Sequence, residues 1–341
     1  MFAVKSARNF LRPLSKSYST MKAIQVSKTG DVSVLEYTDV KKPEINPDTI
    51  LVKNLYSGVN FIDTYFRTGL YPTPLPTLLG REGSGIVEQV GQNVSGFSVG
   101  DTVAYLANNC TYAEYSLAEP KSTYKVPSGV SPDIACASLL QGLTALTLVT
   151  RSYAVKKDDT ILVHAAAGGT GRLVVQLCKY YGAKVIGTTS SEEKAEIAKS
   201  VGCDHIIYYT KEDVATRVAE ITNGKNVDAV FDGVGKSTFQ SSFDSLKLCG
   251  TLVSFGNASG KVPPIEINIL SKKNLVLLRP MLFGYISTKQ EFDHYTGILF
   301  DLIAKKVLDI SICGTFDLKQ AGEAHTFLEA RKSTGKVILK I

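Results

Sequence analysis

The sequence predicts an α/β protein in which a doubly wound parallel sheet stands beside a second, β-rich domain. The chain has 341 residues, which is longer than one hydrophobic core usually grows, so two domains are expected. From about 144 to 280, nearly continuous apolar runs alternate with helical segments, as in a parallel sheet covered by helices on both faces. A turn with three glycines directly follows the first of these runs.

The first twenty residues differ from the rest in composition. They contain Lys5, Arg8, Arg12 and Lys16, several serines and no acidic residue. This composition is typical of a mitochondrial transit peptide, and Met21 offers a second start, so we expect a mitochondrial location, a cytoplasmic location or both. A basic tail without targeting function is the alternative. The rest of the chain is close to neutral, so it is not a basic nucleic-acid module by charge.

The cysteines and the apolar runs argue against two further classes of protein. The six cysteines are spread singly, with no C-x-x-C pair and no Cys/His cluster at ligand spacing, so we expect neither a structural zinc site nor a disulfide framework. No apolar run approaches the roughly 18 residues of a membrane span, so we expect no membrane insertion.

Residues 21–143 form the first segment of the expected β-rich domain. Short β-like runs alternate there with turn signals: MKAIQV, TILVKNLYSGV, GIVEQVG, DTVAYL, YAEYSLA and STYKVP. A long helical stretch begins near the end of this segment, where Ser131 can cap the helix and Pro132 fits its first turn. We expect this helix to bridge the two domains.

Residues 144–280 form the expected parallel domain. Its strands are TILVHAA, KVIGTT, HIIYYT, DAVFDGV, TLVSFGN and NLVLLRP, and its helices include TGRLVVQLCKYYG and EEKAEIAKSVG. Residues 281–341 carry two further helices, TKQEFDHYTGILFDLIAKKV and KQAGEAHTFLEARKS, and two strand-like runs, DISICGTFDL and GKVILKI. We expect these strands to return to the first domain, which makes that domain discontinuous.

The stretch HAAAGGTG (164–171) joins the end of a strand, a tight turn and the start of a helix. Glycines let such a turn approach a pyrophosphate closely, and the helix N-terminus supplies free N–H groups. The stretch is not a full G-x-G-x-x-G, and close packing of the helix is the alternative reason for the glycines. The βαβ context favours a dinucleotide that contacts Gly168, Gly169, Thr170 and Gly171.

The end of the next strand distinguishes between two dinucleotides. An NAD enzyme offers an acidic residue to the ribose there, but this chain offers only hydroxyls at 188–191, with Lys194 one turn into the following helix. Hydroxyls and a cation fit a 2′-phosphate, which a carboxylate would repel. NADPH is therefore the expected cofactor, with Ser190 and Lys194 beside it. The alternatives are a capping box of Ser190 and Glu193, and a solvated Lys194.

Six motifs together resemble the zeta-crystallin, or quinone oxidoreductase, branch of the medium-chain dehydrogenase/reductase superfamily: GVNFIDTYFRTGLYP, GLTAL, HAAAGGTG, GTTSSEEK, VSFGNASG and GKVILKI. The resemblance runs from Met21 to the C-terminus. It implies a GroES-like catalytic domain at 21–143 and 281–341, a Rossmann domain at 144–280, and NADPH between them. It also implies a homodimer that reduces quinones and related electron-poor carbonyl or enone compounds.

The resemblance further implies which residues contact the cofactor. Around its reactive end are Asn60, Tyr65, Gln141 and Thr144. The sheet edge that passes the nicotinamide contains Phe255, Gly256 and Asn257. At the adenosine and phosphate end are Lys194, Tyr209 and Arg331. Neighbouring Tyr208 is the alternative to Tyr209.

Two features depart from the family's pattern. Arg172 follows the last glycine, where relatives carry an apolar residue, so it either adds a phosphate contact or points to solvent. Zinc-containing relatives place a Cys and a His in the regions NFID and GREGSG, where this chain has Asp63 and Arg81. The sequence therefore predicts no metal site and disfavours zinc-dependent alcohol oxidation.

Without a metal, the protein must stabilise the negative charge that develops on the acceptor oxygen. The candidate donors are Tyr65, Tyr71 and the Asn60 amide. Tyr71 resembles a proton-donating tyrosine of enoyl thioester reductases, whereas ordinary wall or core roles are the alternative for both tyrosines. Asp63 is expected to fix its loop by accepting backbone hydrogen bonds. Strand or surface roles are expected for the lone histidines at 164, 205, 294 and 325.

The leading functional hypothesis is an NADPH-dependent quinone reductase that moves hydride or single electrons and protects against oxidative stress. An NADPH-dependent enoyl thioester or enone reductase is the enzymatic alternative, which a mitochondrial leader favours. Binding of AU-rich RNA is a non-enzymatic alternative, although the chain has no arginine-rich segment and no aromatic RNA-binding signature. A purely structural, crystallin-like role is a further alternative.

Overall fold

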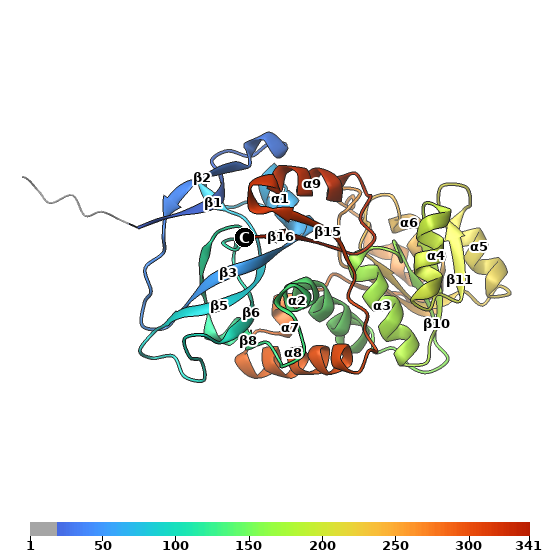
Figure 1. The fold of residues 1–341 in the computed structure, drawn as a ribbon. Helices are drawn as coiled ribbons and strands as arrows, with labels where there is room; N and C mark the ends of the chain where they lie inside the picture. Colours follow the sequence, from blue (N-terminus) through green and yellow to red (C-terminus); the bar gives the residue numbers. More distant parts are fainter. Residues whose placement is uncertain (1–18) are drawn as a thin grey trace, which may run out of the picture.

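The computed structural model describes residues 19–341, and these residues form two regions that lie side by side, each centred on a sheet (Figure 1). Residues 1–18, with almost all of the expected leader, lie outside the described part. The leader therefore stays a prediction.

Six parallel strands form one sheet in the order β11-β10-β9-β12-β13-β14. Their bounds are Thr160–Val163 (β9), Lys184–Thr189 (β10), His205–Tyr208 (β11), Val227–Asp232 (β12), Leu246–Ser254 (β13) and Val276–Leu278 (β14). Counted along the chain, this is the doubly wound Rossmann order, with its switch point between β9 and β12. All six expected strands form, and the predicted fold class is confirmed.

The strands of this sheet are apolar on both faces because helices cover both. Ile161 and Val163 of β9 belong to the core beneath α2 and α3, whereas Leu162 between them belongs to the core on the opposite face. The helices of the sheet are Gly169–Tyr180 (α3), Glu192–Ser200 (α4), Val214–Ile221 (α5) and Phe239–Asp244 (α6). The sequence analysis identified the first two and missed the shorter pair.

The second region contains a seven-stranded sheet and a three-stranded sheet. Strands β15 and β16, from the end of the chain, join the seven-stranded sheet, in which β16 pairs with β3. The other strands are β1 (Thr20–Val26), β2 (Glu36–Lys41), β3 (Ile50–Val59), β4 (Thr77–Leu78), β5 (Glu82–Val90), β6 (Thr102–Leu106), β7 (Tyr115–Ala118) and β8 (Thr123–Lys125), and the two late strands are β15 (Ile312–Asp317) and β16 (Lys336–Lys340).

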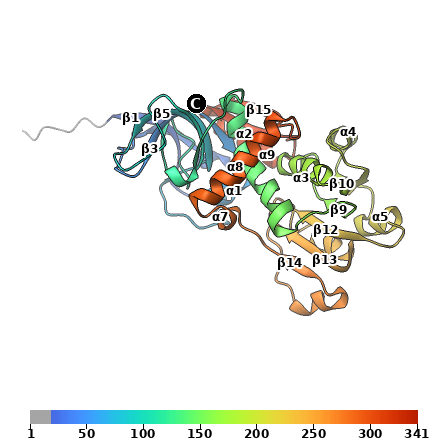
Figure 2. The same cartoon turned by 90° about the horizontal axis from the view of Figure 1, so that it is seen from below.

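Helices fill the space between the two regions. Helices α2 (Pro132–Thr147) and α8 (Lys289–Ala304) pack on each other, and α2 also contacts β3, β5 and α3 (Figure 2). Helix α2 is therefore the predicted bridge. With the turn that follows it, the helical segment Pro132–Ser152 is long and apolar enough to cross a membrane by length and composition, but 72% of its apolar window is buried, as in a core helix.

Three short elements position the site. Helix α1 (Phe61–Thr68) follows β3, α7 (Leu282–Tyr285) follows β14, and α9 (Ala321–Glu329) lies between β15 and β16. The sequence analysis did not predict α1. Its first turn is fixed by Asp63, whose Oδ2 accepts a hydrogen bond from the Asn60 backbone N–H at 2.8 Å, as expected for this carboxylate.

Candidate functional site

The glycine turn after β9 is shaped by contacts within the protein. A Cβ on Gly171 would overlap the Ala165 carbonyl oxygen, and a Cβ on Gly169 would overlap Oε1 of Gln141. Ala165 itself has a left-handed backbone, with φ of 51°. Close packing, the alternative reading of the turn, therefore accounts for these two glycines.

The same turn leaves a ready site for an anion. Helix α3 begins at Gly169, and no side chain caps it at Gly168. The N–H groups of its first turn, which includes Thr170 and Gly171, have no partner within the helix, and the helix dipole favours negative charge there. Donors of this kind at a helix N-terminus commonly bind a phosphate group.

The end of β10 presents hydroxyls to this region. Thr188 Oγ1 lies 3.1 Å from His164 Nδ1, whereas Thr189 Oγ1 is buried and has no hydrogen-bond partner in the described chain. The residue that caps α4 is Ser191, which accepts from the Lys194 backbone N–H at 3.4 Å. The alternative of a capping box by Ser190 and Glu193 is therefore wrong.

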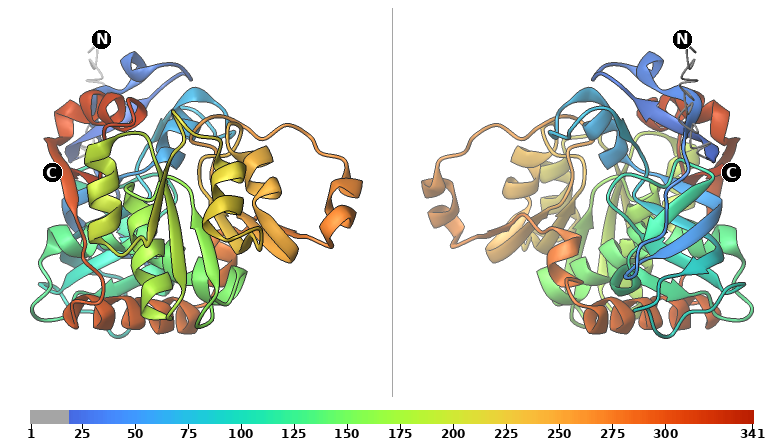
Figure 3. Two further views of the ribbon diagram at one scale, coloured as in Figure 1. Left: turned by 90° about the vertical axis from the view of Figure 1, so that its right-hand side faces the viewer. Right: turned by 90° about the vertical axis from the view of Figure 1, so that its left-hand side faces the viewer.

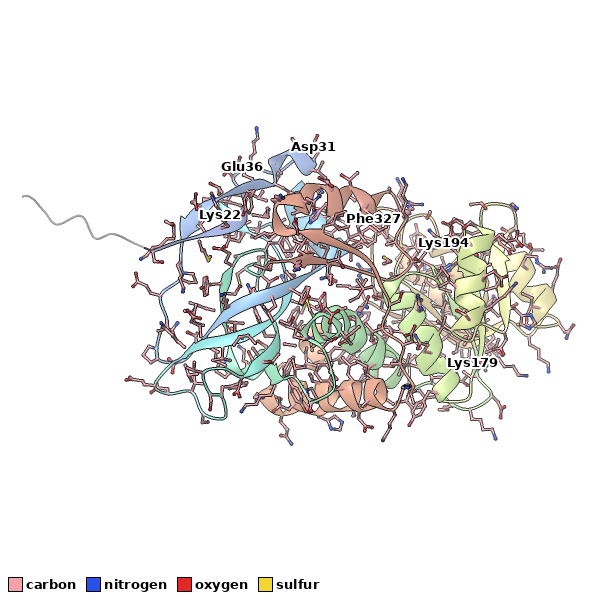
Figure 4. The ribbon with its side chains drawn as sticks, in the orientation of Figure 1. Lys22, Asp31, Glu36, Lys179, Lys194 and Phe327 are labelled. Atoms are coloured by element: carbon pink, nitrogen blue, oxygen red, sulfur yellow. The ribbon has the colours of Figure 1, made fainter. Side chains whose placement is uncertain are left out.

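The Lys194 side chain meets the backbone of Arg331, which comes from a distant part of the sequence. Lys194 lies on α4, where Figure 4 labels it. Its Nζ donates to the carbonyl oxygen of Arg331, which follows α9 and has a φ of 57°. Lys194 is therefore not a freely solvated side chain. Neither side chain pairs with a carboxylate among the described residues, so positive charge is left at the end of β10.

The tyrosine at the adenosine end is the more exposed of two neighbours. Tyr209 is 39% exposed, and its backbone N–H donates to the Thr189 carbonyl at 3.2 Å. Tyr208 is half-buried, and its ring faces the Lys211 ammonium at 5.6 Å. The geometry favours Tyr209, as the resemblance does.

Arg172 follows neither of its expected alternatives. Its Nη1 donates to the Thr334 carbonyl at 2.9 Å, and its Nη2 pairs with Asp309 at 3.0 Å. The side chain is 11% exposed, so it neither points to solvent nor is free to bind a phosphate. It ties α3 to the segment that leads into β16.

The end of β13 is pressed against the end of β12. A Cβ on Gly256 would overlap the Gly233 carbonyl oxygen, and the Phe255 N–H donates to the Asp232 carbonyl at 2.8 Å. Arg279 holds this turn from the other side, because its Nη1 donates to the carbonyl oxygens of Ser254 at 3.1 Å and Gly256 at 3.0 Å. The sequence analysis missed Arg279.

Asn257 connects this turn to α1. Its backbone N–H donates to the Tyr65 hydroxyl at 3.2 Å, and its side-chain amide lies 3.4 Å from the Tyr71 hydroxyl. The amide is best satisfied with Oδ1 facing Arg279 at 2.9 Å, and in that orientation Tyr71 donates to Oδ1. We refer to this contact of residues 254–257 with Tyr65 and Tyr71 as the seam.

The rings of Tyr65 and Tyr71 pack against each other in the seam. They meet edge to face, with centroids 5.2 Å apart. Burial raises the pKa of Tyr65 to about 12. Tyr65 therefore keeps its proton at neutral pH, which is what a hydrogen-bond donor requires.

The Asn60 side chain is fully engaged by the protein. Its Nδ2 donates to Glu82 at 2.8 Å and to the Gly58 carbonyl at 3.2 Å, and its Oδ1 accepts from Lys336 Nζ at 2.6 Å. Both donor hydrogens are taken, so the expectation that this amide donates to the acceptor oxygen does not fit the geometry. Asn60 can still accept a further hydrogen bond at Oδ1.

Lys336 and Glu82 form a buried ion pair beneath Asn60, and sequence reasoning missed both. Their side chains are 3% and 0% exposed. The other Glu82 oxygen accepts from the Leu140 backbone N–H of α2 at 2.7 Å. On the same helix, Gln141 lies against Gly169, and Thr144 donates back to the Leu140 carbonyl at 2.7 Å.

Two histidines have partners that the sequence did not reveal. His325 Nε2 lies 3.1 Å from the Tyr112 hydroxyl, and its Nδ1 lies 3.1 Å from Arg67. Tyr112 also donates to Asp63 at 3.1 Å, so a buried chain of polar groups runs below α1. His164 lies between two hydroxyls in the core of the parallel sheet. The surface role is wrong for both.

The donor set does not fit zinc. Among residues 19–341, no group of three His, Cys, Asp or Glu side chains is placed to hold a metal ion. In the two regions where zinc relatives carry ligands, Asp63 is engaged with the backbone and Arg81 contributes a cation, which repels a metal ion.

Two protein-family models match the chain. The alcohol dehydrogenase GroES-like domain matches residues 46–159, and the zinc-binding dehydrogenase model matches residues 169–303. A probable quinone oxidoreductase of Schizosaccharomyces pombe is 45% identical over 317 residues, which cover 93% of this chain and 96% of that protein. A 2-haloacrylate reductase of Burkholderia sp is 38% identical over 93% of this chain and 98% of its own length.

A solved structure is also similar to this chain over most of its length. The quinone oxidoreductase of Escherichia coli, whose structure is a complex with NADPH, superposes with a TM-score of 0.90 at 39% identity. The alignment covers 94% of this chain and 100% of that one.

Proposed function

The chain belongs to the quinone oxidoreductase family of medium-chain dehydrogenases/reductases, as the resemblance implied, and from this premise we propose that it reduces quinones with NADPH. The observation that carries the proposal is that the glycine turn, the two cations and the tyrosine-lined seam occur in one chain with this fold. The structure of the E. coli relative, which is a complex with NADPH, supports the choice of cofactor.

The residues present fit NADPH. The uncapped start of α3 receives the pyrophosphate, and the unpartnered Thr189 hydroxyl lies where the ribose is expected. Lys194 and Arg331 supply the charge that a 2′-phosphate needs. Asn60, whose Oδ1 accepts from Lys336 and has a second lone pair, would accept from the carboxamide, and the 255–257 segment, Gln141 and Thr144 would lie along the nicotinamide.

Reduction of a quinone to a hydroquinone consumes one hydride and one proton. When bound, NADPH supplies the hydride and leaves as NADP⁺. Tyr65, whose hydroxyl proton is free, donates a hydrogen bond to the acceptor oxygen on which negative charge develops, and Tyr71 does so when its hydroxyl turns from Asn257 Oδ1 to the acceptor. The proton that completes the hydroquinone comes from solvent by way of these hydroxyls. No metal is required for this step.

An enone reductase is the second candidate, and one observation favours it. The Tyr71 hydroxyl lies at the seam beside Asn257, where it can protonate a carbon or an enolate as well as a quinone oxygen. The similarity to a 2-haloacrylate reductase also supports reduction of an activated double bond.

One assay with the full chain distinguishes the two candidate activities. NADPH oxidation is followed with 1,4-naphthoquinone and with a crotonyl thioester, for wild type, Tyr65→Phe and Tyr71→Phe. For a quinone reductase, we expect the quinone to be the better substrate by kcat/KM, and each variant to lose roughly 10- to 100-fold in kcat. Preference for the thioester with loss confined to Tyr71→Phe would establish the enone reductase instead.

The homodimer is proposed from the free edge of the parallel sheet. Strand β14 has an unpaired edge, and the segment before it projects from the body (Figure 3). Apolar side chains gather here, with Ile267 78%, Met281 70% and Val276 52% exposed. A second copy that adds its own β14 would cover them. Light scattering should give twice 36.9 kDa, and Val276→Glu should give a monomer.

The location and the RNA ligand stay predictions. The composition of residues 1–20 supports a mitochondrial leader, which a fluorescent fusion of those residues tests directly. Competition of NADPH with an AU-rich RNA tests the RNA ligand.

A further inference from the structure

Arg81 is a buried cation without a carboxylate partner in the described part of the chain. Its side chain is 8% exposed, and its one side-chain hydrogen bond runs from Nη2 to Asn108 at 3.0 Å. Its Nε is fully buried and has no partner. Burial lowers the pKa of this guanidinium, as expected for a charge that is poorly compensated.

Another buried arginine, Arg67, has a carboxylate partner of the kind that Arg81 lacks among the described residues. Arg67 is 3% exposed, and Glu329 binds it through two hydrogen bonds of 3.0 and 2.7 Å. The Asp63 carboxylate also acts on Arg81, but burial raises the pKa of Asp63 to about 7, so it is an incomplete counter-charge at neutral pH. A buried guanidinium is costly unless a carboxylate or a similar anion pairs with it.

The Arg81 guanidinium lies between α1 and α7. It is 5.3 Å from the ring centroid of Phe66 on α1 and 5.0 Å from that of Phe283 on α7. The Phe66 ring in turn meets Tyr71 edge to face at 5.9 Å. The charge is therefore framed by aromatic rings next to the tyrosines that the proposed reaction uses.

We propose that Arg81 forms an anion-binding subsite of the acceptor site, where it binds the carboxylate of a planar, electron-poor acceptor. This inference rests on the proposed function and narrows its substrate class to acid-bearing quinones and enones. Arg81 supplies the planar, charged donor that a carboxylate requires, and Phe66 and Phe283 supply apolar faces for a flat ring. Because the subsite is shielded from water, the attraction between the Arg81 guanidinium and a carboxylate is stronger there than at the protein surface.

The test uses benzoate and its neutral isostere benzamide as competitive inhibitors of 1,4-naphthoquinone reduction. Wild type should bind benzoate at least tenfold more tightly than benzamide, and Arg81→Met should lose that preference. Arg151→Met is the matched control, because Arg151 also faces a tyrosine ring, at 5.5 Å, but lies exposed outside the seam. It should keep the preference.

Equal inhibition by both compounds in wild type, or a benzoate preference that persists in Arg81→Met, would overturn the inference. If Arg81→Met does not fold, Arg81→Lys replaces it, since it keeps the charge and loses the planar fork, and at least a threefold loss of preference is expected. If wild type does not reduce the quinone, the proposed function fails, whereas calorimetry of benzoate and benzamide with the NADPH-loaded protein still decides the subsite.

Discussion

The cofactor side and the acceptor side of this site are built differently. On the cofactor side, most parts are neighbours in the sequence: the turn at 168–171 is one strand-to-helix connection, and Ser191 caps the helix that carries Lys194, although Lys194 itself reaches Arg331 across 137 positions. On the acceptor side, Lys336 meets Asn60 across 276 positions, and Asn257 meets Tyr65 across 192. The first side is determined mainly by local sequence, whereas the second exists only in the folded chain.

Removal of one long-range partner should therefore cause the largest loss. Lys336→Met leaves Glu82 buried without its cation, and we expect the free energy of unfolding to fall by about 3–5 kcal/mol, measured by urea denaturation. Lys340→Met, at the exposed end of the same strand, is the control and should change stability by less than about 0.5 kcal/mol. If both substitutions changed the free energy of unfolding by similarly small amounts, the Lys336–Glu82 ion pair would not stabilise the acceptor side.

A change on the locally built side should cost less. Gly171→Ala places a methyl group against the Ala165 backbone, which cannot move aside, and we expect a loss of about 1–3 kcal/mol in the free energy of unfolding. Gly284→Ala is the control, because the space around its Cβ is open. Calorimetric unfolding checks both, and an unchanged Gly171→Ala would show that the turn is looser than its contacts indicate.

A still smaller effect should appear in the pH dependence of stability. Burial raises the pKa of Asp63 to about 7, so its contribution is full below about pH 4 and is lost as pH rises through 7. Burial lowers the pKa of His325 to about 3, so its contribution is full above about pH 6.5 and is lost as pH falls. Between these values the two slopes oppose each other in wild type.

Asp63→Asn removes one of these slopes. The free energy of unfolding of the variant should fall more steeply than that of wild type from pH 6.5 to 4.5, by up to about 1.4 kcal/mol per pH unit. Urea titrations at several pH values measure the slopes. Parallel curves for the two proteins would show that Asp63 is not protonated in the folded chain.

The same difference explains what the sequence could predict. The six parallel strands and helices α3 and α4 follow from apolar runs and caps that lie within a few residues, and they were predicted with nearly their observed bounds. The family resemblance identified the tyrosines and Asn257, but no local pattern said that they touch. Short helices such as α1 were missed because only a cap and a turn define them.

The charged residues of the site were the least predictable. No sequence pattern singled out Lys336, Glu82 or Arg279, and Arg172 was expected at a phosphate or in solvent. Their partners lie on other elements, at positions that only the fold brings near. A lysine buried at the start of a strand carries no local sign of burial, so sequence reasoning could not find this pair.

The central claim is that the cofactor side holds NADPH through its 2′-phosphate, and one titration tests it most directly. Binding of NADPH and NADH is measured by calorimetry for wild type, Lys194→Ala and the control Lys199→Ala, which lies on the same helix but pairs with Glu196. We expect Lys194→Ala to weaken NADPH binding by about 10- to 100-fold and to leave NADH binding unchanged, with no effect of the control. Equal loss for both nucleotides, or no loss for either, would contradict the account.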